Sequence, residues 1–253
     1  MPRPSPRIPS SRPVPDHIGL GATSATTAIL TGDPSRVRWF SEVWGGTPVS
    51  TGDRRGLNYV EFRDTVIMST GMGGPALAIA VEELADLGIE RFVRVGTCGG
   101  LGPVVRPGDL ILPTAAVTDD GTAQAYLPPR VPAVPDFDLH AALVDEARSI
   151  KVEWRAGIVH SKDVYYSEKS ERMVDSTAAD ARWNALRAVG VLATDMEAAA
   201  LFAVGLVRRL RTAAVLVNVG ADLERPYLQS GLEAALRLTK GAFRRTAAES
   251  MSR

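Results

Sequence analysis

Two segments that lie far apart in the sequence carry side chains that together could do chemistry. Phe92–Gly100 (FVRVGTCGG) is an apolar run that contains Arg94 and leads into a predicted glycine-rich turn, and Thr194–Phe202 (TDMEAAALF) is typical of a helix start with Glu197 in its first turn. Arg94 stands between two valines of a predicted strand, so its guanidinium requires a partner. The pair predicts an anion site facing a polyol site, the arrangement that phosphate attack on a sugar would need.

Other glycine-rich loops follow predicted strands. Thr31–Arg36 (TGDPSR) and Ser69–Pro75 (STGMGGP) each follow an apolar run, as does Asn218–Asp222 (NVGAD). Glycines let several backbone N–H groups converge on an anion, a helix N-terminus adds its dipole, and an arginine such as Arg36 adds a bidentate contact. Taken singly, each loop is more typical of an ordinary turn, and Arg94 is the residue that argues for a site.

Three single features have two interpretations each. Thr194-x-x-Glu197 fits a capping box, and spacing alone favours that role for Glu197 over ligand binding. Cys98 is expected to be a small buried side chain rather than a nucleophile, because no histidine lies near it in the sequence. Tyr165 and Tyr166 could stack on a planar ligand or simply pack.

The elements that must position these residues alternate between short apolar strands and amphipathic helices. This alternation predicts a single α/β domain with a mostly parallel or mixed central sheet flanked by helices, and ligands collect at the carboxyl ends of such strands. The predicted strands are Thr26–Leu30, Thr65–Thr70, Arg91–Val95, Gly108–Leu112, Ala156–His160 and Thr212–Val219. The predicted helices are Pro75–Leu87, Asp138–Ile150, Asp195–Arg209 and Leu228–Ala248.

The amino-acid composition limits the kinds of binding partner that the protein can have. The 253 residues include 29 basic and 29 acidic side chains, which argues against a nucleic acid or a membrane surface bound by bulk electrostatics. One cysteine excludes an internal disulfide, and three histidines far apart suggest no metal motif. No apolar run reaches spanning length, so the cytoplasm is the expected compartment. Residues 1–15 are rich in proline and arginine and predict a disordered tail before a domain over 16–253.

Taken together, TGDPSR, FVRVGTCGG and DMEAAAL, in this order and spacing, resemble the hexameric-type nucleoside phosphorylase family, and most of all its uridine phosphorylases. The resemblance runs from about His17 to about Ala248 and is densest over Ser69–Leu112. It implies cleavage of the N-glycosidic bond of a nucleoside by inorganic phosphate, giving free base and ribose 1-phosphate. It also implies no metal or organic cofactor, a dimer as the minimal active unit, and a hexamer built as a trimer of dimers.

The resemblance also implies roles for particular residues and reverses the capping interpretation of Glu197. Asp222 falls where the purine enzymes of the family keep an acid that protonates the base. The implied phosphate ligands are Gly32, Arg36, Arg94 and Thr97, with Arg54 or Arg55 from a neighbouring subunit; the implied ribose ligands are Met196, Glu197 and a neighbour's His17; the implied base ligands are Cys98, Gly99, Tyr165 and Arg172.

The base pocket departs from the family pattern. The segment after Tyr165-Tyr166 keeps Arg172, but Ser170 stands where uridine phosphorylases have a glutamine that reads uracil. We therefore expect a uridine-type enzyme of altered or relaxed base choice. A purine enzyme that uses Asp222 and an enzyme for a modified nucleoside are the alternatives within phosphorolysis. A nucleosidase that uses water, or a nucleoside-binding protein without catalysis, are alternatives outside it.

Overall fold

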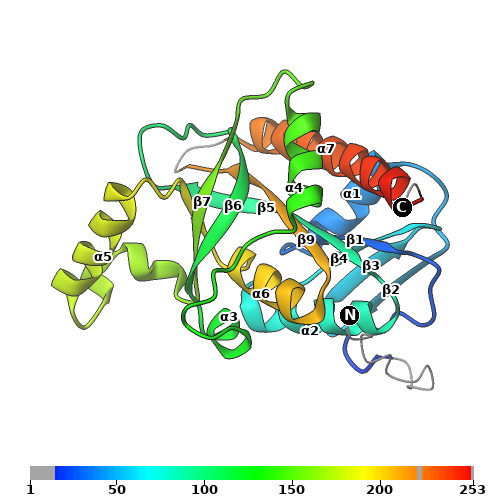
Figure 1. Ribbon diagram of the computed structural model, residues 1–253, viewed down its shortest axis with the longest axis horizontal. Helices are drawn as coiled ribbons and strands as arrows, with labels where there is room; N and C mark the ends of the chain where they lie inside the picture. The colour runs from blue at the N-terminus through cyan, green and yellow to red at the C-terminus, as the bar shows by residue number, and fades with distance from the viewer. Residues whose placement is uncertain (1–14, 221–223, 252–253) are drawn as a thin grey trace.

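Short runs of β-branched and aliphatic residues build the centre of the molecule. Across residues 15–220 and 224–251, which the computed structural model describes, nine strands form one mixed sheet in the order β2-β3-β4-β1-β5-β8-β7-β6-β9, and β5 also pairs with β9 (Figure 1). The strands are β1 (Thr27–Thr31), β2 (Ser50–Arg54), β3 (Leu57–Glu61), β4 (Thr65–Ser69), β5 (Arg91–Gly100), β6 (Leu110–Asp119), β7 (Trp154–Lys162), β8 (Ala193–Asp195) and β9 (Arg211–Asn218).

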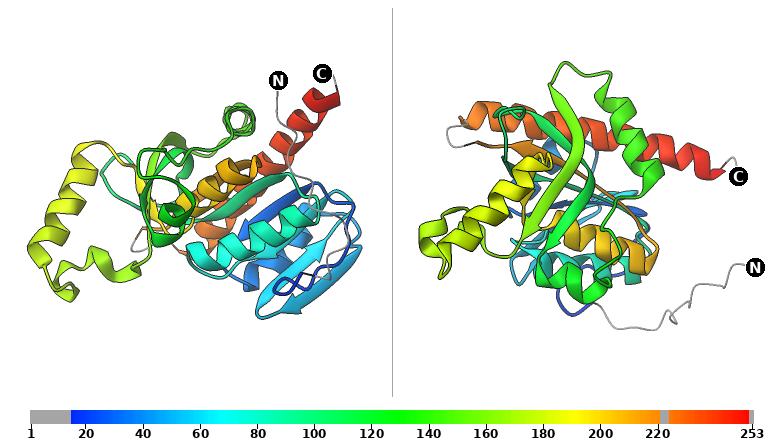
Figure 2. Two further views of the ribbon diagram at one scale, coloured as in Figure 1. Left: turned by 60° about the horizontal axis from the view of Figure 1, so that its bottom comes forward. Right: turned by 60° about the vertical axis from the view of Figure 1, so that its left-hand side comes forward.

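Helices cover both faces of the sheet. One apolar core joins the sheet to α2, α3 and α6, and a second joins it to α1, α4 and α7 (Figure 1). The helix α5 and two short 3-10 turns, η1 and η2, project beyond β7 (Figure 2). The bounds are α1 (Ser35–Trp44), α2 (Gly74–Asp86), α3 (Gly121–Tyr126), α4 (Phe137–Ala147), η1 (Tyr165–Glu168), η2 (Ser170–Arg172), α5 (Ser176–Ala188), α6 (Ala198–Arg208) and α7 (Arg225–Met251).

The predicted fold class is confirmed, and the parallel strands bring the predicted loops together. β1 pairs in parallel with β4 and with β5, so the loops after β1 and β4 lie beside the middle of β5, near Arg94. The N–H of Thr70 donates to the carbonyl of Thr31 at 2.8 Å, which joins the first two loops directly. These loops open α1 and α2, and Pro75 stands in the first turn of α2, where its missing N–H costs nothing.

Several sequence predictions of the elements are wrong. The predicted turn over Gly96–Gly100 is the second half of β5, because Thr97 and Cys98 pair with β9 and Gly99 pairs with Thr194 of β8. The helix predicted from Asp195 begins only at Ala198. The sequence analysis missed β2, β3, β8, α1, α3 and α5; β3, β8 and α3 are short, β2 (STGDR) is mostly polar, and α1 and α5 carry many polar residues.

Two predictions concern residues outside the described part of the chain. The predicted tail over residues 1–15 lies, except for Pro15, outside the described residues, and so does Asp222. Among the described residues, no helix has the length and apolar character needed to cross a bilayer.

Candidate active site

Arg94 and Glu197 meet in the buried interior at the end of the central strands. Nη2 of Arg94 donates to Oε2 of Glu197 at 2.5 Å, and both side chains are at most 5% exposed. The second carboxylate oxygen, Oε1, accepts the backbone N–H of Gly73 at 2.7 Å, just before α2. The sequence prediction that Arg94 needs a partner is confirmed, and the two segments that motivated it are in direct contact.

The rest of the Arg94 guanidinium points away from Glu197. Its Nε and Nη1 are buried and make no hydrogen bond within the described part of the chain. A Cβ built on Gly32 would lie 3.8 Å from Nη1, so this nitrogen faces the loop after β1. A Cβ on Gly96 would come within 2.8 Å of Cζ of Arg94, which explains why position 96 has no side chain. Unpaired buried guanidinium N–H groups are costly unless an anion completes them.

Arg36 approaches the same place from the first turn of α1. Burial lowers the pKa of its guanidinium, Asp33 raises it through an ion pair of 3.6 Å, and the nearby charge of Arg94 lowers it further. Because the charge of Arg94 disfavours that of Arg36, an anion between the two guanidinium groups would be stabilised. Thr97, also predicted to bind phosphate, is half-buried on β5.

Glu197 occupies the N-cap position of α6, but its side chain makes no capping hydrogen bond, so the capping-box interpretation is wrong. Asp195 takes that part instead, with Oδ2 accepting the N–H of Ala198 at 3.0 Å. Ser161 completes the cap, since its Oγ accepts the N–H of Ala199 at 2.9 Å and donates to Oδ1 of Asp195 at 2.5 Å. The carboxylate of Glu197 is thereby left to face Arg94.

Asp195 is a functional candidate that sequence analysis missed. Its Oδ2 lies 3.6 Å from Nε of Arg94, and its side chain is fully buried. Burial is the largest cause that raises the pKa of Asp195, to about 6; Arg94 opposes the rise and Glu197 adds to it. The DME run was noted for its glutamate, and the parallel pairing of Ser161 with Asp195 that buries this aspartate is not visible in the sequence.

The predicted base ligands divide into two groups. Cys98 is buried and Gly99 half-buried on β5, and burial raises the pKa of the Cys98 thiol, which fits an inert side chain rather than a nucleophile. Tyr165 and Arg172 lie instead on the exposed turns η1 and η2. Tyr165 packs edge-on against Tyr166 at 5.1 Å between centroids, and the guanidinium of Arg172 lies over the Tyr166 ring, 4.6 Å from its centroid.

A cluster of largely buried polar residues connects these turns to the sheet. The sequence analysis did not predict it. Lys162 forms an ion pair with Glu168 of η1 and lies 4.9 Å from the ring centroid of Trp183 of α5. The indole N–H of Trp183 donates to the carbonyl of Ser167 at 2.7 Å. His160 contacts the same indole edge-on and bonds Asp119 at 3.0 Å. The residues of β7 (WRAGIVHSK) carried no signal for this cluster.

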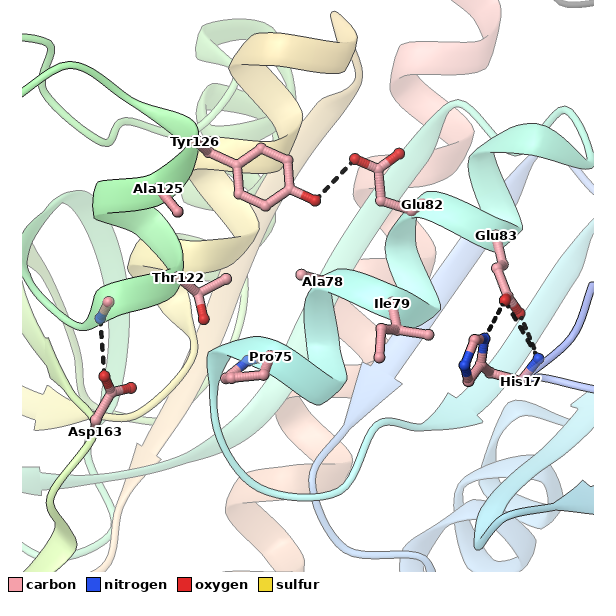
Figure 3. A pocket seen from close by; sticks show the side chains of 11 residues that line it. His17, Pro75, Ala78, Ile79, Glu82, Glu83, Thr122, Ala125, Tyr126 and Asp163 are labelled. Atoms are coloured by element: carbon pink, nitrogen blue, oxygen red, sulfur yellow. Dashed lines mark hydrogen bonds and ion pairs between the residues drawn. The ribbon is translucent and has the colours of Figure 1, made fainter.

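His17 lies far from its own Arg94–Glu197 pair. Its Nδ1 is 2.5 Å from Oε1 of Glu83 on α2 (Figure 3). Glu83 stands ten residues after Gly73, which binds Glu197, and ten residues of helix span about 15 Å. His17 lines an open hollow of about 650 Å³ along α2 and α3, and neither Arg94 nor Glu197 lines it.

The two candidate phosphate arginines of the β2–β3 turn are similarly remote. Arg54 and Arg55 are exposed, and β2 stands four places from β5 in the sheet, or about 19 Å at ordinary strand spacing. Arg55 occupies the turn with a φ of 56°. The Arg54 side chain packs beside Gly19, in the segment that carries His17.

The chain is similar to known proteins over most of its length. The family model of the phosphorylase superfamily matches residues 26–246. A uridine phosphorylase of Treponema pallidum is 40% identical over 217 residues, or 83% of each chain. A uridine phosphorylase of Escherichia coli is 35% identical over 219 residues, covering 80% of this chain and 85% of its own. A guanosine phosphorylase of Halorubrum lacusprofundi is 34% identical over 231 residues, covering 85% and 91%.

Proposed function

Because the chain belongs to the phosphorylase superfamily, we propose that it cleaves the N-glycosidic bond of a nucleoside with inorganic phosphate, giving free base and ribose 1-phosphate. The observation that carries the proposal is the buried Arg94. One edge of its guanidinium binds Glu197 and Nε lies 3.6 Å from Asp195, while Nη1 faces Gly32 and makes no hydrogen bond to any described residue. An anion on Arg94 and a hydroxyl donor on Glu197 would therefore be neighbours.

Phosphate would occupy the space between the two arginines. Nη1 of Arg94 and the guanidinium of Arg36 supply charge, while Gly32 lets the backbone approach and Thr97 adds a hydroxyl donor. Glu197 would accept hydrogen bonds from the 2′- and 3′-hydroxyls, since each carboxylate oxygen has a lone pair beyond those that bind Gly73 and Arg94. Met196, half-buried beside it, would pack on the sugar.

In this proposal, the position of the phosphate accounts for most of the catalysis. Loss of the base builds positive charge on the sugar, and a phosphate fixed below C1′ is both the nucleophile and the counter-charge. Positioning of this kind reaches effective molarities of about 10⁵ M or more. The departing base carries negative charge, which a donor over the ring must relieve. Phosphate is a co-substrate in this scheme, which uses no metal or organic cofactor.

The active unit in this proposal is at least a dimer. His17 and Arg54 lie about 15 to 19 Å from the Arg94 site of their own chain by helix and strand spacing. They belong to neighbouring segments, since Arg54 packs beside Gly19, so one surface could carry both into a second subunit. This contact supports Arg54 over Arg55 as the phosphate ligand. A hexamer built from three such dimers is the proposed assembly, with the cytoplasm as its compartment.

Base choice is proposed as uridine-type and relaxed. Tyr165 would stack on the base, Cys98 and Gly99 would line its edge, and Arg172 would bind a carbonyl after it leaves Tyr166. Ser170 is too short to replace the uracil-reading glutamine of the family. The guanosine phosphorylase among the relatives keeps a purine enzyme as the second candidate, with Asp222 as the acid.

The test is a phosphorolysis screen over uridine, thymidine, inosine, guanosine and adenosine, with and without phosphate. We expect product only with phosphate, and ribose 1-phosphate as the sugar product. Equal rates without phosphate would identify a nucleosidase, and no product despite thermal stabilisation by nucleosides would identify a binding protein. Asp222→Asn is run alongside. Loss of purine cleavage alone would assign the purine reaction to that acid, and an unchanged variant supports the uridine-type choice.

A further inference from the structure

The anion site contains more negative charge than its proposed task requires. Asp195 and Glu197 share the single guanidinium of Arg94, at 3.6 Å and 2.5 Å, and all three side chains are almost completely buried. The proposed function would bring a phosphate dianion to the remaining edge of Arg94. Three anionic groups would then surround one buried cation, with Arg36 as the second positive charge, and like charges in a buried site raise one another's proton affinity.

The two carboxylates differ in whether they can hold a proton. Both hydrogen-bond partners of Glu197 are obligatory donors, the N–H of Gly73 and the guanidinium of Arg94. Asp195 has one partner that can reverse, because Oδ1 lies 2.5 Å from the hydroxyl of Ser161. Ser161 accepts only one N–H, from Ala199, so its oxygen retains a lone pair for a proton carried by Asp195.

Groups from three elements surround Asp195 and affect its protonation. The strand β5 contributes Arg94 and the buried Cys98, the start of α6 contributes Glu197 and the N–H of Ala198, and β7 contributes Ser161. Burial raises the pKa of Asp195 to about 6 even with the positive charge of Arg94 beside it. A dianion on the far side of Arg94 would raise this pKa further.

We propose that Asp195 is a positioning residue that balances the charge of the oxyanion site: as a carboxylate it holds the Nε edge of Arg94 in the empty site, and it takes up one proton from solvent when an oxyanion binds. The proton lies on Oδ1 and is shared with Ser161. The inference rests on the proposed function for the identity of the oxyanion site. It adds that anion binding is coupled to the uptake of one proton, which comes from solvent and not from the anion or the nucleoside.

Sulfate is the probe for this proposal, because it stays a dianion across the pH range in which phosphate itself titrates. The test is calorimetric titration of the whole protein with sulfate at pH 7, in buffers of different ionisation enthalpy. We expect uptake approaching one proton per site. Above pH 6 the dissociation constant for sulfate should rise with pH, by up to about tenfold per unit, and below pH 6 it should be flat.

Two further measurements assign the proton. Asp195→Asn should bind sulfate without proton uptake and with little pH dependence, while the exposed Asp145→Asn should behave as the wild type. In the wild-type protein, sulfate should produce a protonated carboxyl band in the infrared difference spectrum that shifts on ¹³C-aspartate labelling. This readout does not depend on how the variant folds.

The outcomes separate this inference from the function on which it rests. Sulfate binding without proton uptake, or uptake that persists in Asp195→Asn, overturns the role of Asp195 and leaves phosphorolysis intact. If neither sulfate nor phosphate binds, and phosphate does not stimulate cleavage, the oxyanion site and the proposed function fail together.

Discussion

The two halves of the candidate site are built differently. The Arg94–Glu197 half is buried and is held by backbone groups of β5, β8, the start of α2 and the start of α6. The half that would hold the base lies on η1 and η2, where Tyr165 is 65% exposed. In the proposed function, the chemistry that every substrate shares would thus be fixed by strand order, whereas base choice would depend mainly on side chains of an exposed segment. This division fits relatives of 35% and 34% identity that act on uridine and on guanosine.

The largest effect should come from a change at Arg94, the central residue of the buried half. Arg94→Ala removes the cation shared by two buried carboxylates, and we expect kcat/KM to fall about 10³-fold or more with every nucleoside. The unpaired carboxylates should also lower the melting temperature. Steady-state kinetics and thermal unfolding measure the two effects. Arg38→Ala, on the exposed face of α1, is the control and should change neither. A loss confined to one base would contradict the proposed division.

Glu197→Gln sharpens the sugar side of the comparison. The amide keeps the shape but loses the charge that accepts the ribose hydroxyls, so we expect kcat/KM for uridine to fall about 10²-fold. With 2′-deoxyuridine the variant should lose less, because one of the two hydroxyl contacts is already absent. Kinetics with both nucleosides measure the difference. Equal losses for the two substrates would show that Glu197 does not bind the 2′-hydroxyl.

Asp195→Asn tests the buried half through stability. Because the folded pKa of about 6 exceeds the ordinary value of 3.8, neutral Asp195 favours the folded state fully below about pH 4, and this contribution is lost as pH rises through 6. The free energy of unfolding of the variant minus that of the wild type should therefore increase by about 2 kcal/mol from pH 4 to pH 8. Urea unfolding at several pH values measures it. A difference that stays constant with pH would mean that Asp195 does not titrate there.

Sequence analysis identified the buried half better than the exposed half. Arg94 and Arg36 were proposed from the residues themselves, because glycine loops at parallel strand ends must converge and a mid-strand arginine needs a partner. Glu197 was proposed as a ligand only through the resemblance to the family. Arg94 therefore carried its own signal. The same local logic failed for Glu197, whose capping pattern is contradicted by a contact with Gly73 that lies far away in the sequence.

The features that sequence analysis missed depend on pairing between distant strands. Asp195 is buried because β8 pairs with β7 at Ser161 and with β5 near Gly99, and three residues are too few to give β8 a periodic pattern. The cluster of Lys162, Trp183 and Glu168 likewise joins β7, α5 and η1. Composition and spacing describe neighbours along the chain, and they do not report which polar residues become buried neighbours across a sheet.

The smallest expected effect lies in the exposed half and tests whether base choice can change alone. Arg172 rests on Tyr166 in the structure, so its contact with a base requires a side-chain rearrangement and contributes modestly. Arg172→Ala should lower kcat/KM for uridine about tenfold, mainly through KM, and leave the KM for phosphate unchanged. Lys169→Ala, exposed on the same segment, is the matched control. A change in the KM for phosphate would mean that the two halves are coupled. In the proposed site Arg172 contacts the base and not the phosphate held by Arg36 and Arg94, so its removal could alter phosphate binding only through such coupling.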